Sequence, residues 1–474
     1  MKAAMATFFH AYANSVLVYL LTVNTIYFIL VLVGFLELIR CRYITLDRAK
    51  LGSIERSTLL PPISILAPAF NEMASIHESV RAMLNLRYPE FEVIVINDGS
   101  KDQTLQGLID EFHLYRSARF FDSTLKTARV RRIYESMDPI RLVVVDKDNG
   151  GKADAVNAGI NVAQYPLICV VDADSILEEE SLLKVVGPFL EYPGEVLAVG
   201  GIVRIANGCT VSGGRIETID LPRSWIARFQ VVEYLRAFLG GRVAFSSFNC
   251  MLIISGAFGL FQKAAVLAVG GFSTETMGED MELTSRLQHW ARRQKKKQRI
   301  VFQPDPVCWT EAPESLNGLK GQRRRWQRGT IESLWAHRQM FGRPRFGMVG
   351  LFAFPYFVFF EMFSPIVELS GYLIMIIGLS LGFFGTREAF LFFSAAVLYG
   401  IILSTASVVL EELTMRRYPK VRNLLTLVLA GILEGFGFHQ LLSFWRAYAF
   451  VEIFKGTKTW GDMERKGFQG TGPS

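Results

Sequence analysis

The chain has few cysteines, no dinucleotide-binding fingerprint and no P-loop, and these absences exclude several common classes of protein. Its five cysteines, at positions 41, 169, 209, 250 and 308, are widely spaced and include no C-x-x-C pair. No histidine pair lies near them at the spacing of zinc ligands, so we expect neither a disulfide framework nor a zinc site. The motifs G-x-G-x-x-G and G-x-x-x-x-G-K-[ST] are also missing, which argues against a dehydrogenase and a P-loop ATPase.

The charge distribution also lacks any feature that points to nucleic acid. The 474 residues include 51 Lys and Arg against 44 Asp and Glu, a net charge of +7. Much of this excess lies beside apolar segments, as at Arg416, Arg417 and Lys420, where lipid headgroups provide the counter-charge. Because no segment interleaves aromatic and basic residues as RNA-binding motifs do, we expect no nucleic-acid partner.

Apolar residues, in contrast, are abundant and concentrated in four blocks. Residues 16–36 form an uncharged run of about 20 residues, the length that an α-helix needs to cross a bilayer. Further apolar blocks cover residues 348–384, 390–410 and 424–454. The first block is too long for the h-region of a signal peptide and lacks a small-residue cleavage site, so we expect a permanent anchor.

Basic residues around the first block predict its orientation. Arg40, Arg42, Arg48 and Lys50 follow it, whereas only Lys2 precedes it, so the segment after the anchor should be cytoplasmic. We therefore predict a multi-pass protein of the cell (plasma) membrane. The expected order is an external N-terminus (1–14), a transmembrane helix (15–37), a cytoplasmic domain (38–335), interfacial helices (336–362), two transmembrane helices (363–411), a cytoplasmic loop (412–422), a transmembrane hairpin (423–454) and a cytoplasmic tail (455–474).

The last apolar block leaves two topologies open. It contains Gly435-Phe-Gly437 near its centre and could turn back as a hairpin, which would place the tail in the cytoplasm. One long tilted helix would place the tail outside, and we favour the hairpin. Glu361, Glu368 and Glu434 fall inside apolar blocks, where a carboxylate is costly unless it faces protein or water. They would either line a polymer path or serve as hydrogen-bonded structural carboxylates.

The long segment between the first two blocks reads as an α/β domain. Residues 63–67, 92–96, 142–145 and 167–171 are nearly continuous runs of aliphatic residues, typical of strands that helices cover on both faces. Helical segments separate these runs, as expected for a parallel sheet. Ligands of such sheets bind outside the carboxyl ends of the strands. The polar residues found there include Asn71, Glu72, Asp98, Asp172 and Asp174.

Asp172 and Asp174 leave the last of these runs together as a D-x-D triplet. Two hard oxygen ligands of this kind suit Mg²⁺ or Mn²⁺, which completes its shell with phosphate oxygens and water. The alternative is a solvated turn with a helix cap. The position directly after a buried strand favours the metal site.

Two further segments have residue types that suit phosphate binding and proton transfer. Gly150-Gly151-Lys152 lies at a predicted strand-to-helix junction, where backbone N–H groups and the helix N-terminus attract a diphosphate. Asp280 lies at the start of a predicted helix and is either an N-terminal capping carboxylate or a general base for a sugar hydroxyl.

Residues 322–328 form a basic segment with one tryptophan in its middle. It is either a membrane-surface or solvated basic face, or a fork in which Arg325 holds a pyrophosphate leaving group. In the second case Trp326 would be the stacking platform for a sugar ring, because the faces of sugars are apolar and suit aromatic planes.

In order along the chain, these segments resemble the processive branch of family 2 glycosyltransferases, which includes cellulose, chitin, hyaluronan and poly-N-acetylglucosamine synthases. The match covers about residues 60–330. Its motifs are Pro68-Ala-Phe-Asn71-Glu72, Val95-Ile-Asn-Asp98-Gly-Ser100, Gly151-Lys152-Ala, Asp172-Ala-Asp174, Gly278-Glu-Asp280 and Gln322-Arg-Arg-Arg325-Trp326.

The resemblance implies a GT-A fold, inversion at the anomeric carbon, a UDP-sugar donor and Mg²⁺ or Mn²⁺. Its implied partners are a growing polysaccharide or a lipid-linked acceptor and the bilayer, and it leaves room for an accessory membrane subunit. By position it assigns donor binding to Asn71, Glu72, Asp98, Lys152, Asp172, Asp174, Gln322 and Arg325, metal binding to Asp172 and Asp174, the catalytic base to Asp280, acceptor binding to Glu279 and Trp326, and a gating tail to Lys458 and Trp460.

Two features depart from the family pattern. Gly278 stands where the family usually has threonine, and an insert at residues 112–137 has no assigned role beyond a place at the membrane surface or against a partner chain. Three functions remain open: a processive synthase, a single-addition transferase with a lipid-linked acceptor, and a non-catalytic transport or scaffold subunit. The last is disfavoured because all candidate catalytic positions are filled, and the sequence does not choose between glucose and N-acetylglucosamine.

Overall fold

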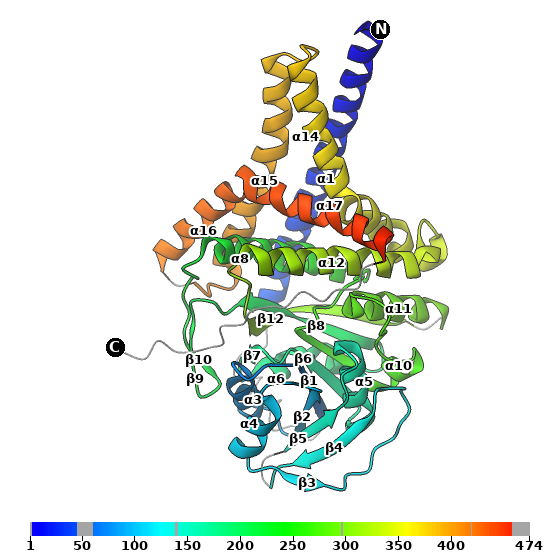
Figure 1. The fold of residues 1–474 in the computed structure, drawn as a ribbon, viewed down its shortest axis with the longest axis vertical. Coiled ribbons are helices and arrows are strands. Elements are labelled where there is room, and N and C mark those ends of the chain that lie inside the picture. The colour runs from blue at the N-terminus through cyan, green and yellow to red at the C-terminus, as the bar shows by residue number, and fades with distance from the viewer. Residues whose placement is uncertain (1, 45–59, 138–140, 295–296, 419, 457–474) are drawn as a thin grey trace.

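The computed structural model describes residues 2–44, 60–137, 141–294, 297–418 and 420–456. A mixed ten-stranded sheet with helices on both faces forms one half, and long helices rise from it to form the other (Figure 1). The strands of the main sheet are β1 (Ile63–Ala69), β2 (Phe91–Asp98), β3 (Tyr115–Ser117), β4 (Val130–Glu135), β5 (Leu142–Lys147), β6 (Leu167–Val171), β7 (Ser175–Leu177), β8 (Val196–Ile205), β11 (Phe258–Gln262) and β12 (Arg299–Thr310). A separate ribbon pairs β9 (Thr210–Ser212) with β10 (Arg215–Thr218).

The four strands predicted from sequence lie side by side in the centre of the sheet. The order is β3-β4-β5-β2-β1-β6-β11-β8-β12-β7, and the pairs β5-β2, β2-β1 and β1-β6 are parallel. Ile63 pairs with Phe91 on one side and with Leu167 on the other, so the three strands end at the same edge. Nearly all of their side chains are buried, as expected for strands covered on both faces.

Helices of the domain cover the sheet and then meet the membrane-directed half. They are α3 (Ile76–Leu84), α4 (Thr104–Glu111), α5 (Lys152–Val162), α6 (Ser181–Val185), α7 (Gly187–Glu191), α8 (Trp225–Leu235), the π-helix η1 (Arg236–Arg242), α9 (Val243–Ser247), α10 (Lys263–Ala268), α11 (Glu279–Arg293) and α12 (Leu316–Ala336). The last, α12, runs between the sheet and the helical half (Figure 1).

Three helices rise together from the domain: α1 (Lys2–Ile44), α14 (Ser364–Ser380) and α15 (Thr386–Thr414) (Figure 1). At about 1.5 Å per residue, α1 is about twice as long as the hydrocarbon core of a bilayer. The predicted anchor at 15–37 therefore lies inside α1, which is longer at both ends. Gly371 on α14 lets the helices approach closely, because a Cβ there would lie 2.6 Å from Val16 on α1.

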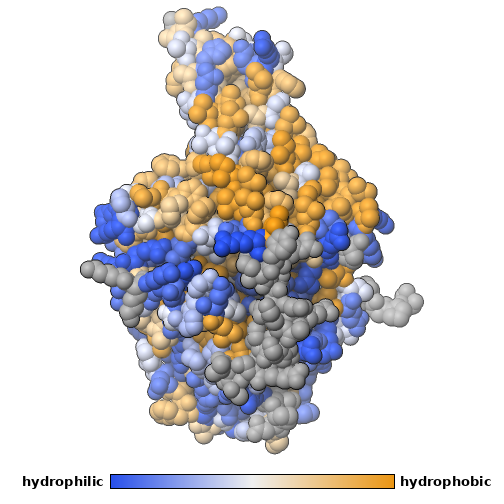
Figure 2. All heavy atoms as spheres, turned by 180° about the vertical axis from the view of Figure 1, so that it is seen from behind, coloured by the Kyte–Doolittle hydropathy of each residue, from blue (hydrophilic) through white to orange (hydrophobic). Residues whose placement is uncertain are grey.

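Within the described residues, three helical stretches have the length and composition of membrane spans: 2–40, 386–414 and 421–455. A fourth arises if residues 349–362 and 364–380, which meet at a bend of 42°, form one span. Hydrophobic surface is concentrated over this helical half, whereas polar surface covers much of the domain (Figure 2). Both observations agree with a membrane protein whose domain lies to one side of the bilayer.

The predicted interfacial segment at 336–362 consists of short helical pieces that lead into α14. They are η2 (Arg338–Met340), η3 (Pro344–Phe346), η4 (Val349–Ala353), α13 (Phe354–Tyr356) and η5 (Phe357–Met362). The insert at 112–137 contains β3 and β4, at the sheet edge far from the long helices (Figure 1). This position disfavours the membrane-surface alternative and leaves the alternative of a contact with a partner chain as a prediction.

The structure differs from the predicted hairpin at 423–454. The helices α16 (Val421–Leu433) and α17 (His439–Lys455) follow one another across the break η6 (Glu434–Phe438), and they do not form two antiparallel arms (Figure 1). The break is at Phe436 and at Gly437, whose φ of 99° favours glycine. It changes the direction of the chain without reversing it, because α17 packs along α12 through contacts such as Leu319 with Leu442.

Candidate functional site

A cavity of about 1150 Å³ opens at the carboxyl edge of the central strands and continues between the long helices. It gathers side chains that are far apart in the sequence. The predicted site residues that line it are Asn71, Glu72, Asp98, Lys152, Asp172, Asp174, Glu279, Asp280, Gln322, Arg325 and Trp326. The two predicted tail residues, Lys458 and Trp460, lie outside the described residues.

Lys152, the first residue of α5, is the cation at the centre of the carboxylate cluster. Its Nζ lies 2.5 Å from Asp172 Oδ1 and 3.5 Å from Glu279 Oε1, and it donates to the carbonyl of Gly256 over 3.4 Å. Burial alone would lower the pKa of Lys152, but the carboxylates around it outweigh that effect and raise the pKa above its ordinary value. The lysine is therefore charged and joins the end of β6 to the start of α11.

Glu279, in contrast to Lys152, is a buried carboxylate next to other carboxylates. Burial raises its pKa above the ordinary value, Lys152 opposes this, and the neighbouring Asp280 adds to it. One lysine thus compensates three carboxylates, since Asp172, Glu279 and Asp280 all interact with it electrostatically. The cluster retains an excess of negative charge, which a bound cation would relieve.

Asp172 and Asp174 fit a divalent cation that shares its shell with a phosphate. Asp172 is partly exposed to the cavity, whereas Asp174 is buried, with Thr310 Oγ1 and Ser175 Oγ each 3.5 Å from its Oδ1. No group of three His, Cys, Asp or Glu side chains in the described part of the chain could hold a metal alone. Mg²⁺ and Mn²⁺ are commonly held by one or two carboxylates, with phosphate and water as the other ligands, so the residues fit.

Asp98 at the end of β2 is fully engaged within the protein. Its carboxylate accepts from Lys147 Nζ at 2.5 Å and from the backbone N–H groups of Gly150 and Gly151 at 3.0 and 2.8 Å. Asp98 therefore already occupies the N–H groups of both glycines, and the attraction of a diphosphate to the N-terminus of α5 stays a prediction. Asp98 holds the glycine turn in place and so positions Lys152.

Asn71 and Glu72 fix the turn after β1. Asn71 Oδ1 accepts from the N–H of Lys101 over 2.8 Å, and the N–H of Asn71 donates to Ser100 Oγ over 3.0 Å. Glu72 Oε2 accepts from Ser75 Oγ at 3.2 Å. These bonds tie the turns after β1 and β2 together at the floor of the cavity.

Asp280 occupies the first turn of α11, as the sequence predicts, and its carboxylate has two anchors. The N–H of Met281 donates to Oδ1 over 2.7 Å, and the N–H of Gly256 donates to Oδ2 over 3.0 Å. Each oxygen keeps lone-pair capacity on the cavity side, since a carboxylate accepts about four hydrogen bonds. The contact with Met281 fits a carboxylate that satisfies an N–H group in the first turn of a helix, and the role of Asp280 as a general base stays a prediction.

The glycine that replaces the family's usual threonine has a structural cause. A Cβ on Gly278 would lie 2.8 Å from the Cα of Gly329 on α12, so no side chain fits between the two backbones. A hydrogen bond also connects these two segments, because the N–H of Met277 donates to Glu332 Oε2 on α12 over 2.8 Å. The start of α11, with its base, is therefore pressed directly against α12.

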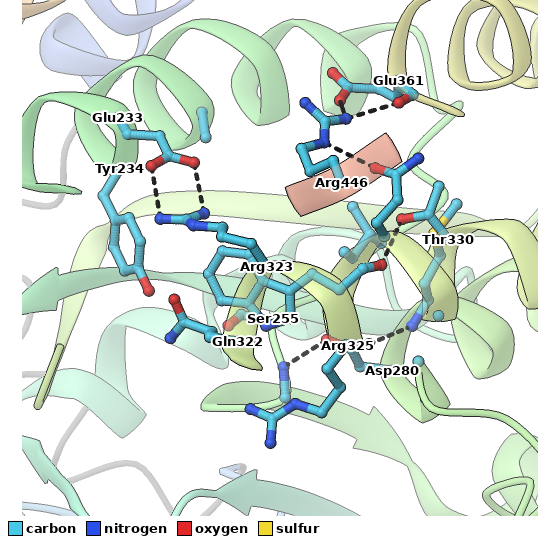
Figure 3. A pocket seen from close by; sticks show the side chains of 18 of the residues that line it. Glu233, Tyr234, Ser255, Asp280, Gln322, Arg323, Arg325, Thr330, Glu361 and Arg446 are labelled. Carbon is cyan, nitrogen blue, oxygen red and sulfur yellow. Dashed lines mark hydrogen bonds and ion pairs between the residues drawn. The ribbon is translucent and has the colours of Figure 1, made fainter. Parts of the chain in front are cut away.

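Two residues of α12 face the donor end of the cavity. Gln322 is buried, and its side-chain oxygen accepts no hydrogen bond from any described residue, so it is ready for a hydroxyl of a ligand. Arg325 points away from Glu233 (Figure 3) and lines the same cavity as Asp280. Its planar fork suits a diphosphate.

Trp326 is held by an ion pair that the sequence did not reveal. The guanidinium of Arg323 lies 4.5 Å from the centre of the Trp326 ring, and Glu233 accepts from it at 2.6 and 2.7 Å (Figure 3). The ring of Tyr234 lies beside that of Trp326, and the two ring centres are 6.4 Å apart. The indole remains 42% exposed and is available to a sugar ring.

Beyond these residues, the cavity is lined by acid–base pairs in which every acid comes from the helical half. Glu361 accepts from Arg446 (Figure 3), Glu434 accepts from Arg236 over 2.6 Å, and Glu368 lies 3.1 Å from His439. The three glutamates that the sequence places in apolar blocks therefore each have a partner, and all of them face the cavity.

Two kinds of functional residue were not predicted from the sequence. Lys147 ends a buried strand yet is a lysine, which is a detectable anomaly and marks it as the partner of a buried acid. Glu233 and Arg446 gave no signal, because their partners lie 90 and 119 residues away in α12.

Comparison with known proteins agrees with this geometry. The profile of the family described as "Glycosyltransferase like family 2" matches residues 61–329, and that of "Chitin synthase" matches residues 274–466. The poly-beta-1,6-N-acetyl-D-glucosamine synthase of Staphylococcus epidermidis is 29% identical over 272 residues, 57% of this chain and 55% of that protein. Its counterpart from Staphylococcus aureus strain COL is 31% identical over 278 residues, 58% of this chain and 56% of that protein. The chain thus matches about half the length of these relatives.

The fold is also found among solved structures. The mannosyltransferase PcManGT from Pyrobaculum calidifontis, solved with GDP-Man and Mn²⁺, superposes with a TM-score of 0.54 at 16% identity, covering 89% of this chain and 99% of that one. This confirms the predicted GT-A-type α/β fold. With a family profile that spans more than half of its residues, the chain belongs to the glycosyltransferase-like family 2.

Proposed function

We propose that this protein is a multi-pass synthase of the cell membrane that polymerises N-acetylglucosamine from a UDP donor. The domain is cytoplasmic in this proposal, and the product passes between the long helices. The choice of sugar rests on the relatives, which are named as poly-N-acetylglucosamine synthases, and on the match to the chitin synthase profile.

One observation carries the proposal: a single cavity connects the carboxylate cluster to the space between the long helices. Its lining runs from Asp172 and Asp280 in the domain to Tyr372 on α14 and Gly400 on α15. A transferase that adds one sugar to a lipid-linked acceptor needs the first part but does not need a path between the helices for a growing product. The continuous lining therefore favours a polymer.

The chemistry follows from the arrangement of the domain residues. Asp280 takes the proton from a hydroxyl of the acceptor sugar, and that oxygen attacks the anomeric carbon of the donor. A new carbon–oxygen bond forms as the bond to the diphosphate breaks, and attack from the opposite face inverts the configuration. UDP leaves with the bonding electrons, and Lys152 and Arg325 lie where they can balance its charge.

Asp172 and Asp174 would hold Mg²⁺ or Mn²⁺ in this reaction. The cation, when bound, supplies Lewis-acid stabilisation of the diphosphate. Gln322 offers its unsatisfied side-chain oxygen to the donor, and Trp326 offers its ring to the acceptor, held by Arg323 and Glu233.

The test is a product assay with the purified full chain in detergent. UDP release is measured with Mg²⁺ or Mn²⁺ against a panel of UDP-sugars, and the products are sized. Long products made from UDP-N-acetylglucosamine alone are expected. One sugar added to lipid would support the single-addition transferase, and no release with any donor would contradict a catalytic role for this chain.

A further inference from the structure

Five arginines line the cavity, and four of them have interaction partners. Three of them form ion pairs with glutamates: Arg236 with Glu434, Arg323 with Glu233, and Arg446 with Glu361. Arg325 also has an interaction partner. The fifth, Arg242, makes no hydrogen bond or ion pair with any described residue. Cations in apolar cavities are normally paired, because an unpaired buried charge is costly.

Arg242 is the last residue of η1 and lies among aromatic side chains. Its guanidinium rests 3.9 Å from the ring centre of Phe238, one turn earlier. Phe245, Tyr356 and Phe357 line the same region of the cavity, with the first two ring centres 5.1 Å apart. The surroundings are therefore apolar, and the N–H groups of the guanidinium have no protein acceptor to bind.

Asp280 supplies the counter-charge from a distance. Burial lowers the pKa of Arg242 to about 10, and the carboxylate of Asp280 is the largest influence that opposes this. The two groups line the same cavity and interact electrostatically, yet they do not form an ion pair. The guanidinium thus keeps N–H groups that no described side chain accepts from, and these suit a neutral, oxygen-rich ligand.

We propose that Arg242 binds the terminal sugar of the acceptor chain and presents its hydroxyl to Asp280. This inference rests on the proposed function and extends it. A guanidinium only donates hydrogen bonds, and sugar hydroxyls and an acetamide carbonyl are suitable acceptors. Aromatic rings beside it suit the apolar face of the same sugar. Arg242 is thus an acceptor-binding residue, distinct from Lys152 and Arg325 on the side of the donor diphosphate.

The test measures acceptor binding and donor binding separately. Full-length protein in detergent is titrated calorimetrically with a β-1,6-linked N-acetylglucosamine oligosaccharide in the presence of UDP and Mn²⁺, and then with UDP alone. For Arg242→Gln we expect about 10- to 100-fold weaker oligosaccharide binding, as for loss of hydrogen bonds to a charged group, with UDP affinity unchanged. Unchanged UDP affinity also shows that the variant is folded.

Arg228→Gln is the matched control. Arg228 also rests on an aromatic ring, 4.8 Å from the centre of Trp225, but it does not line the cavity. Its substitution should leave both affinities unchanged. If Arg242→Gln does not fold, Arg242→Lys keeps the charge without the planar fork and should still weaken oligosaccharide binding by about fivefold or more.

Two results would overturn the proposal. Weaker UDP binding with unchanged oligosaccharide binding would assign the guanidinium to the donor, and unchanged binding of both ligands would leave it without either role. The polymerase proposal fails separately, since it requires the wild-type protein to form polymer, whereas the role of Arg242 is decided by binding alone.

Discussion

The two ends of the cavity differ in how far their carboxylates are compensated by basic side chains. At the domain end, Asp172, Glu279 and Asp280 share one lysine, so negative charge is in excess. At the helical end, Glu361 and Glu434 each have an arginine of their own. An uncompensated cluster suits a cation and a reacting diphosphate, whereas locally balanced pairs suit a neutral chain that must pass without binding tightly.

The difference also shows how the two ends are connected. Along α12, Gln322, Arg325 and Trp326 face the domain end, while Gln327 accepts from Arg446 of α17 over 2.8 Å. The same helix also touches the start of α11 through Gly329. A change of position of α12 would therefore reach both the base and the helical end.

The largest expected effect comes from removing the base at the domain end. Asp280→Asn should lower kcat by about 10²- to 10⁴-fold, because the acceptor hydroxyl loses its proton acceptor. UDP affinity should not change, since the amide keeps the shape of the carboxylate. UDP release and UDP binding by calorimetry give the two quantities.

Equal activity of this variant and the wild-type protein would show that the excess negative charge serves binding alone. Asp110→Asn, an exposed substitution on α4, is the control for handling of the protein.

The next effect concerns the cation that the excess charge predicts. Removal of divalent metal with EDTA should weaken UDP binding by about tenfold or more, because Asp172 and Asp174 would then repel the diphosphate. Asp174→Asn should reproduce part of the loss in the presence of metal. Titration of Mn²⁺ into the metal-free protein, with UDP affinity as the readout, measures both effects.

UDP binding that is independent of metal in both proteins would contradict a metal role for the pair. In that case Lys152 and Arg325 would compensate the diphosphate without a cation.

A smaller effect should follow from separating α11 and α12. In Gly329→Ala, the new Cβ would lie 2.7 Å from the backbone N and Cα of Gly278, so one helix must move. Overpacking of this kind costs about 1–3 kcal/mol in the free energy of unfolding. We expect a lower thermal midpoint and a lower kcat, because the base and Arg325 shift relative to each other.

Gly321→Ala on the same helix is the matched control, since nothing lies within 4 Å of its new Cβ. It should maintain or raise stability, as alanine favours a helix over glycine by about 1 kcal/mol. If both variants behave alike, the close contact of Gly278 with Gly329 has no role in alignment.

The smallest effect on the reaction is expected at the helical end. Glu434→Gln removes the carboxylate partner of Arg236 and leaves a net positive charge in the path between the helices. Product length should fall by a few-fold, about what 1 kcal/mol of altered binding produces, while initial UDP release stays the same. Product sizing by gel or mass spectrometry is the measurement.

A drop in initial UDP release equal to that of Asp280→Asn would break the comparison, because the two ends would then act as one site. Glu388→Gln, at the first turn of α15 and outside the cavity lining, is the control.

Periodicity and local chemistry determined much of this molecule from sequence. Four aliphatic runs became β1, β2, β5 and β6, since a strand buried on both faces tolerates few other residue types. The D-x-D pair, Lys152 and Asp280 follow strands or begin helices, and the common edge of a parallel sheet brought them together.

Tertiary structure alone decided which of these groups are already engaged. Asp98 is occupied by Lys147 and two glycine amides, Arg323 by Glu233, and Gly278 by the backbone of α12. It also decided that α17 lies along α12 and does not return as a hairpin. Hydropathy shows how apolar a segment is. The direction in which a helix runs depends on its contacts with side chains from distant parts of the chain. A single sequence does not show those contacts locally.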